Sequence, residues 1–132
     1  MKGNTLKRNE MLKSKIQISN LFEKGLRFNK YPLKILILPV DASVQYEACL
    51  LMVMVSAKKY KKAVIRNRIK RVVKEAYRQN KKVFYPYLTE NNKKCLLGIM
   101  YNGNENPTFE EIEKPIISLL KRVPGTYEKN NK

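Results

Sequence analysis

The residues best suited to chemistry are the lysines and arginines between positions 58 and 82, KKYKKAVIRNRIKRVVKEAYRQNKK. This stretch holds twelve Lys or Arg and a single acid, Glu75, so it carries eleven of the seventeen net positive charges of the 132-residue chain. Like charges four residues apart on a helix repel each other by a few tenths of a kcal/mol. We infer that an anionic partner relieves this repulsion.

Basic side chains at this density suit phosphate oxygens, because arginine offers a planar fork for two oxygens and lysine a mobile point charge. The candidate nucleic-acid-binding residues are Lys58, Lys59, Lys62, Arg66, Asn67, Arg68, Lys70, Arg71, Lys74 and Arg78. Asn67 can also accept a hydrogen bond. Its partner could be a base edge, a ribose hydroxyl or a neighbouring arginine. The alternative is an ordinary solvated helix face, which the scarcity of acids disfavours.

The spacing of apolar residues predicts that these cations are carried by a helix. One arc of a helix from 63 to 80 is apolar and predicted to face the core: Ile65, Ile69, Val72, Val73 and Ala76, with Tyr77 at its edge. On the opposite side four cations recur every fourth residue: Arg66, Lys70, Lys74 and Arg78. Asn67 and Arg71 lie between them and Arg68 on the far flank, so the sequence predicts one continuous donor surface.

The chain contains no histidine, which removes the commonest general base near neutral pH, the Ser-His and Cys-His nucleophile pairs and most zinc sites. The acids are scattered apart from Glu110, Glu111 and Glu113. Those three follow Thr108 where a helix begins, and Thr108 with Glu111 indicates a capping box. No glycine-rich phosphate loop occurs either. We therefore expect no catalytic residue and no metal site in the protein itself.

The remaining elements are set by apolar runs and capping residues. Ser14 with Gln17 predicts a helix from about Lys15 to Lys24, stopped by Gly25. Apolar runs at 33–38, 48–56 and 95–101 predict strands, of which the first two can pair as neighbours. A last helix follows Thr108, and Pro115 either kinks it or delays its start to near Glu113.

The length fits one domain, residues 1–132, with 1–11 and 124–132 as frayed tails. Cys49 and Cys95 lie inside apolar runs, where we expect buried thiols rather than a disulfide, since nothing indicates an oxidising compartment. The first fifteen residues lack the apolar stretch of a signal peptide, and no run approaches 18 apolar residues. We expect a cytoplasmic protein with no membrane association.

The string AVIRNRIKRVVKEAYR, residues 63–78, resembles the signature of the bacterial ribonuclease P protein subunit, an Arg-Asn-Arg followed by a basic pair and a Glu-Ala. Val55-Ser56 and Lys58-Lys59 resemble the strand end and lysine pair of that family. Residues 12–38, LKSKIQISNLFEKGLRFNKYPLKILIL, resemble its first helix, terminating glycine and first strand. The resemblance extends over nearly the whole chain.

This resemblance implies a protein that joins a catalytic RNA subunit to remove 5′ leaders from precursor tRNA, an endoribonuclease whose chemistry lies in the RNA. It implies that the basic helix faces that RNA and that Mg²⁺ is held mainly by the RNA, and no protein partner is evident. It also implies an α+β fold, a small two-layer sandwich of a mixed sheet and about three helices. The basic helix then lies in a left-handed βαβ crossover, against the general right-handed preference.

The resemblance further places a cleft for the single-stranded leader between the first helix and the sheet, at positions that align with Ile18, Phe22 and Leu36. Such strands are held by stacking on aromatic rings, yet only Phe22 is aromatic here. A core role for Phe22 therefore stays open, as does substitution by Phe28 or Tyr31.

Two other functions fit the composition. A non-enzymatic structural RNA-binding protein, ribosomal or chaperone-like, would carry the same charge. A basic helix on a membrane surface is weaker, because its apolar stripe lacks Trp and Phe and is needed for the core. Cleavage of precursor tRNA by the cognate RNA with and without the protein separates these functions.

Overall fold

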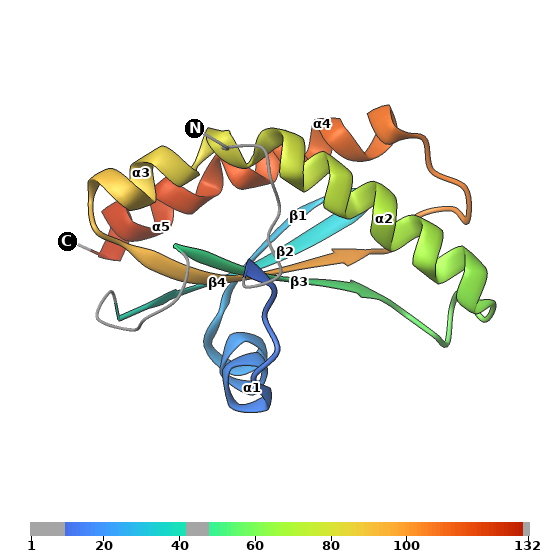
Figure 1. Ribbon diagram of the computed structural model, residues 1–132, viewed down its shortest axis with the longest axis horizontal. Helices are drawn as coiled ribbons and strands as arrows, with labels where there is room; N and C mark the ends of the chain where they lie inside the picture. Colours follow the sequence, from blue (N-terminus) through green and yellow to red (C-terminus); the bar gives the residue numbers. More distant parts are fainter. Residues whose placement is uncertain (1–9, 42–47, 131–132) are drawn as a thin grey trace.

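The chain forms a four-stranded mixed sheet with helices on both faces (Figure 1). The computed structural model describes residues 10–41 and 48–130. Its elements are α1 (Lys15–Lys24), β1 (Leu26–Lys30), β2 (Leu33–Val40), β3 (Cys49–Val55), α2 (Ala63–Asn80), the 3-10 turn η2 (Lys81–Val83), α3 (Tyr85–Glu90), β4 (Lys94–Tyr101), α4 (Phe109–Leu120) and α5 (Arg122–Asn130). This confirms the predicted α+β class and mixed sheet, and it adds α3 and α5 to the three expected helices.

The strands lie in the order β1-β2-β4-β3. β2 is antiparallel to β1 and β4, whereas β3 is parallel to β4. The prediction that 33–38 and 48–56 pair as neighbours is wrong, because β4, which is almost continuously buried, takes the position between them. β1 is not predicted by the sequence pattern, because in this edge strand only Phe28 is partly buried.

The crossover from β3 through α2 to β4 is left-handed. In Figure 1, β3 lies nearer the viewer than β4, both strands run from left to right, and α2 returns above the sheet. The path therefore turns anticlockwise as it moves away from the viewer. This confirms the handedness implied by the family resemblance, against the statistical preference for right-handed crossovers.

Two apolar clusters fill the spaces on either side of the sheet. α2, α3, α4 and α5 cover one face and α1 lies alone on the other (Figure 1). Gly98 in β4 permits the close approach of α1, because a Cβ there would lie 3.1 Å from Leu21 Cδ2 and 3.0 Å from Met54 Cε.

The predicted box at Thr108 is confirmed, whereas at Ser14 only one half of the predicted box is present. Ser14 Oγ accepts a hydrogen bond from the Gln17 amide at 3.3 Å, and Thr108 with Glu111 forms the complete reciprocal box. α4 begins at Phe109, so Pro115 lies inside the helix rather than before it. Both cysteines are buried free thiols, as expected.

The described parts of the two segments that were predicted to be frayed tails pack against the rest of the chain. α5 continues to Asn130 and buries Val123, Thr126 and Tyr127. At the other end Glu10 is 2% exposed and Leu12 donates its amide hydrogen to the Leu51 carbonyl at 2.8 Å. Residues 1–9 and 131–132 of the predicted tails lie outside the described residues. The missed signal is the spacing of Leu120, Val123 and Tyr127, which continues the apolar side of α4.

Candidate nucleic-acid interface

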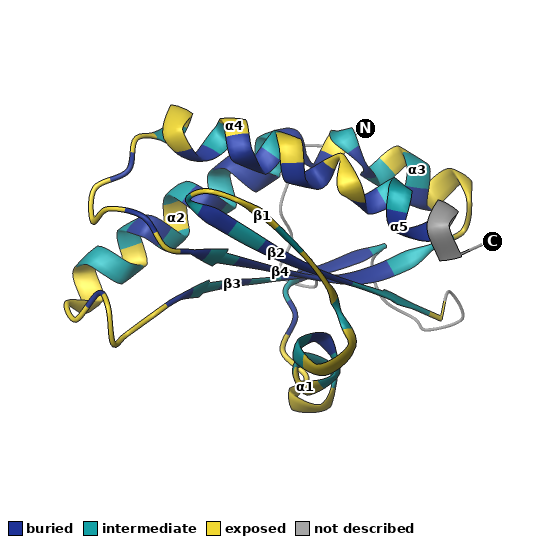
Figure 2. Cartoon of the chain, turned by 180° about the vertical axis from the view of Figure 1, so that it is seen from behind, coloured by how far each residue is buried: buried dark blue, intermediate teal, exposed yellow. Residues whose placement is uncertain are grey.

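The cationic surface is carried by α2, whose bounds are those predicted and whose apolar side is anchored in the core. Its fully buried side chains are Ile69, Val73, Ala76 and Tyr77, and Ile65 and Val72 pack partly buried against them. Tyr77, predicted at the edge of the arc, is completely buried, and burial raises the pKa of its hydroxyl. Because this side is fixed, the other side of α2 is held toward solvent (Figure 2).

All ten predicted nucleic-acid-binding residues are exposed or half-buried. Within the described part of the chain, the side chains of six of them make no hydrogen bond or ion pair: Lys58, Lys62, Asn67, Lys70, Arg71 and Lys74. Their polar groups are available to an external acceptor. None of the ten is buried in an internal ion pair, so the predicted surface position of this set is consistent with the structure.

Arg66 has a second task at the start of α2. Its Nη1 donates to the carbonyl oxygens of Tyr60 at 2.7 Å and of Lys61 at 3.1 Å. The N-cap residue, Lys62, makes no capping hydrogen bond with its side chain. Arg66 therefore holds the turn that leads into the helix, while Nη2 remains available for a phosphate.

The loop that follows β4 is held by four side chains, which donate hydrogen bonds to four successive carbonyl oxygens. The hydrogen bonds run from Lys59 to Asn102, from Tyr60 to Gly103, from Tyr101 to Asn104 and from Arg68 to Glu105. The Arg68 Nη2 to Glu105 oxygen distance is 2.6 Å. Two of the residues predicted to bind nucleic acid, Lys59 and Arg68, thus donate hydrogen bonds to the protein backbone. The sequence around each residue gives no sign of this role.

We expect Arg68→Gln and Arg71→Gln to weaken RNA binding in different ways. Arg71 is exposed and unpaired, so its loss should reduce the slope of log affinity against log salt by about 1. Arg68→Gln should leave the slope unchanged and increase hydrogen exchange in residues 102–105. Binding measured across a salt series, with exchange mass spectrometry, checks this; equal slope changes in the two variants would contradict it.

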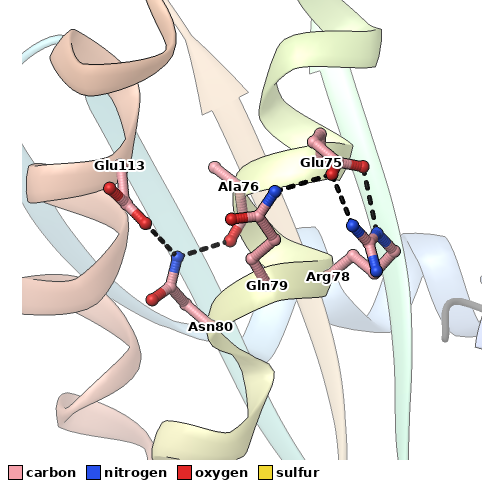
Figure 3. Close-up of polar contacts among 6 residues, drawn as sticks. All are labelled: Glu75, Ala76, Arg78, Gln79, Asn80 and Glu113. Carbon is pink, nitrogen blue, oxygen red and sulfur yellow. Dashed lines mark hydrogen bonds and ion pairs between the residues drawn. The ribbon is translucent and has the colours of Figure 1, made fainter. Parts of the chain in front are cut away.

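At its C-terminal end the basic surface contains its one acid (Figure 3). Glu75 accepts hydrogen bonds from Arg78 Nε at 3.0 Å and from Gln79 Nε2 at 2.7 Å, and lies 2.5 Å from Arg78 Nη2. Hydrogen bonding to Arg78, and then to Gln79, lowers the pKa of Glu75 to about 2. Glu75 therefore stays ionised near neutral pH and offsets part of the Arg78 charge.

The same end of α2 is joined to α4. Asn80 Nδ2 donates to Glu113 Oε2 at 3.0 Å and to the Ala76 carbonyl at 2.8 Å (Figure 3). Asn80 is buried, so these hydrogen bonds hold the C-terminal end of α2 in place against α4.

On the opposite face of the sheet, the three predicted leader-binding residues are not equivalent. Ile18 and Phe22 are half-buried on α1 and pack against the smaller cluster. Leu36 is completely buried beneath α1 with Leu21 and Leu96. The Leu36 side chain therefore faces the helix rather than an open cleft, and a contact between Leu36 and the leader stays a prediction.

In residues 10–41 and 48–130, no group of three or more Cys, Asp or Glu side chains is placed to hold a metal ion. Three acids lie close together in the sequence: Glu110, Glu111 and Glu113. The first two lie in the first turn of α4, and Glu113 accepts a hydrogen bond from Asn80 of α2. No helix in the same residues is long and apolar enough to span a membrane.

Comparison with known proteins gives one consistent result. A family model described as Ribonuclease P matches residues 6–124. The ribonuclease P protein component of Porphyromonas gingivalis is 34% identical over 121 residues, covering 91% of this chain and 87% of the relative. That of Petrotoga mobilis is 33% identical over 122 residues, covering 86% and 98%.

Solved structures agree in fold. The RNase P protein from Thermotoga maritima superposes with a TM-score of 0.67 at 22% identity, covering 86% of this chain and 96% of that one. The Staphylococcus aureus RNase P protein gives 0.67 at 18% identity, covering 85% and 93%. At these identities the likeness shows a shared architecture.

Proposed function

Because the chain belongs to the ribonuclease P protein family and is a protein subunit of that enzyme, we propose that it assists a catalytic RNA in removing the 5′ leader from precursor tRNA in the cytoplasm. The observation that carries the proposal is the row of partner-free polar and cationic side chains along α2. The row is held on a helix whose other side is locked in the core, so it meets RNA as a preformed surface.

Docking on the RNA subunit uses the exposed side of α2. Lys70, Arg71 and Lys74 lie one turn or less apart, which presents cations to successive phosphates without rearrangement of the backbone. Asn67 adds an amide that can pair with a base edge or a ribose hydroxyl. A purely structural RNA-binding role is disfavoured by the family match, which extends over nearly the whole chain.

The hydrolytic chemistry belongs to the RNA in this proposal. The chain has no histidine, and its described residues provide no set of ligands for a metal ion. Magnesium is therefore assigned to the RNA component. The protein contributes electrostatic stabilisation: cations near RNA phosphates reduce the repulsion that otherwise opposes folding of the RNA and close approach of a second polyanion.

The leader is assigned to the α1 face of the sheet. Ile18 and Phe22 border this face, where Met52, Met54 and Met100 are also only partly buried. Adaptable apolar side chains beside a half-exposed ring suit stacked bases of any sequence.

Addition of the protein to its cognate RNA should restore precursor cleavage at low magnesium, where the RNA alone is slow. Protein cations replace part of the screening that magnesium otherwise supplies. Single-turnover cleavage measured across a magnesium series is the test. An unchanged rate at every concentration would favour the structural RNA-binding alternative.

Phe22→Ala should weaken binding of precursors with a leader by about tenfold, since one stacked base contributes roughly 1–3 kcal/mol. Binding of mature tRNA, which lacks the leader, should not change. The comparison is made with the reconstituted holoenzyme, and thermal melting verifies that the variant is folded. An equal loss for both RNAs would mean that Phe22 acts only in the core.

A further inference from the structure

The helix α1 is anchored to the sheet by a single fully buried side chain. Among the ten residues of α1, all of which the structure describes, Leu21 is the only buried one. The helices α2, α3, α4 and α5 all lie on the opposite face of the sheet and give α1 no support (Figure 1). A helix of this length has little stability of its own in water. Contacts other than the packing of Leu21 must therefore fix its orientation.

The C-terminal end of α1 is closed by a tight turn at Gly25. The Gly25 amide hydrogen is donated to the Leu21 carbonyl oxygen at 2.9 Å. A Cβ at position 25 would lie 2.4 Å from that oxygen and 3.2 Å from Leu21 Cδ1, so glycine permits an approach that another residue would prevent. Since β1 begins at the next residue, Leu26, its first side chains start close to the last turn of α1.

Arg27 of β1 pairs with a carbonyl oxygen that α1 cannot satisfy by itself. The last four carbonyl groups of an α-helix have no partner within the helix, and in α1 the carbonyl of Phe22 is one of them. Arg27 Nη2 donates to the Phe22 oxygen at 2.8 Å. The guanidinium is also a cation at the negative end of the helix dipole, where positive charge is favourable. Arg27 thus holds the last turn of α1 from outside the helix.

The strand register places Arg27 on the face of the sheet that α1 covers. Arg27 is the partner of Leu36 across β1 and β2, and directly opposite residues of antiparallel strands point to the same face. Leu36 is completely buried in the same cluster as Leu21, and Phe22 packs against that cluster. The Arg27 side chain therefore reaches α1 across the face to which the leader is assigned.

The position of the Phe22 ring depends on the order of this last turn. Phe22 is half-buried, so packing holds its ring from one side, and helix ends are the parts of a helix that fray. A ring that is already fixed binds a base with a smaller loss of conformational entropy than a mobile one. A contact that keeps the last turn formed therefore raises the affinity of the ring for a base without touching the RNA.

We propose that Arg27 is a positioning residue for the leader. By holding the Phe22 carbonyl, it keeps the last turn of α1 formed and the Phe22 ring in place against the sheet. This inference rests on the proposed leader-binding function and adds to it the residue that orients the stacking ring.

The test uses the reconstituted holoenzyme with a precursor that carries its full leader and one whose leader is shortened to one nucleotide. Arg27→Met keeps the apolar stem but removes the donor, so KM for the full-leader precursor should rise about fivefold with kcat unchanged. KM for the short-leader precursor should not change. Arg27→Lys, which can donate to the same carbonyl, should restore most of the affinity. Lys30→Met removes an exposed cation from the other face of β1 and should behave like the wild type.

A double-substitution cycle separates positioning from direct contact with the leader. If Arg27 acts through Phe22, the variant Phe22→Ala/Arg27→Met should lose no more affinity than Phe22→Ala alone. The salt dependence of leader binding should also stay the same in Arg27→Met, whereas a lost phosphate contact would reduce the slope of log affinity against log salt by about 0.7. Additive losses, or a reduced slope, would show that Arg27 binds the leader itself and would overturn the positioning role.

Hydrogen exchange locates the effect in the protein. Exchange in residues 21–25 should increase in Arg27→Met, while thermal melting verifies that the rest of the chain is folded. If shortening the leader leaves KM of the wild type unchanged, the proposed leader binding itself fails. If shortening the leader raises KM but Arg27→Met and the wild type bind the full-leader precursor alike, the inference about Arg27 alone is overturned.

Discussion

The affinity of this protein for its RNA subunit will fall roughly 10³-fold between 50 and 200 mM monovalent salt. The estimate assumes that about six phosphates are neutralised, each contributing about 0.9 to the slope of log affinity against log salt. Six basic side chains on or beside α2 supply the contacts: Lys58, Lys62, Arg66, Lys70, Arg71 and Lys74. Fluorescence anisotropy with labelled RNA measures the slope directly.

The triple substitution Lys70→Gln/Arg71→Gln/Lys74→Gln should reduce this loss to roughly 50-fold, since three phosphate contacts disappear. The matched control is Lys24→Gln/Lys114→Gln/Lys121→Gln, which changes the net charge equally at exposed lysines on α1 and at α4. The control should keep the wild-type slope. Identical slopes for the two triple variants would show that total charge, and not the surface of α2, binds the RNA.

The bounds and orientation of α2 were predictable because every signal in that segment agrees. Apolar residues recur with the helical period, and acids are nearly absent between the cations. Local patterns of this kind do not depend on the rest of the chain. The same holds for the starts of α1 and α4, where the capping residue and its partner lie three positions apart.

The role of individual cations was not predictable in the same way. Lys59 and Arg68 donate hydrogen bonds to carbonyl groups 43 and 37 residues later in the chain. Whether these two side chains are available to RNA therefore depends on the position of the loop after β4. β1 was missed for a related reason, since an edge strand with one half-buried side chain shows no apolar alternation. The position of β4 between β2 and β3 also depends on which apolar run is buried most completely.

The left-handed crossover could be predicted only from the family resemblance. Handedness statistics alone would have placed α2 in a right-handed connection. Composition, period and capping contain no information that reverses this preference. Only the match of residues 63–78 to a family motif predicted the observed path (Figure 1).

Lys81→Met should destabilise the protein by about 3–5 kcal/mol, because it leaves a buried carboxylate without its cation. Lys81 Nζ lies 2.9 Å from Glu10 Oε2, and the two side chains are 5% and 2% exposed. The sequence places Lys81 in the basic stretch and Glu10 in a predicted frayed tail, yet their ion pair joins residue 10 to the C-terminal end of α2. Urea denaturation followed by circular dichroism measures the loss.

Two further variants separate the cost of the unpaired charge from the value of the pair. Lys82→Met removes an adjacent exposed lysine and should change the free energy of unfolding by no more than about 0.5 kcal/mol. The double substitution Glu10→Leu/Lys81→Met replaces the pair by apolar groups and should recover most of the stability lost in Lys81→Met. If Lys81→Met and Lys82→Met prove equally mild, residues 10–12 do not hold the α2 terminus in solution. If the double variant is as unstable as Lys81→Met, the carboxylate left behind is not the source of the loss.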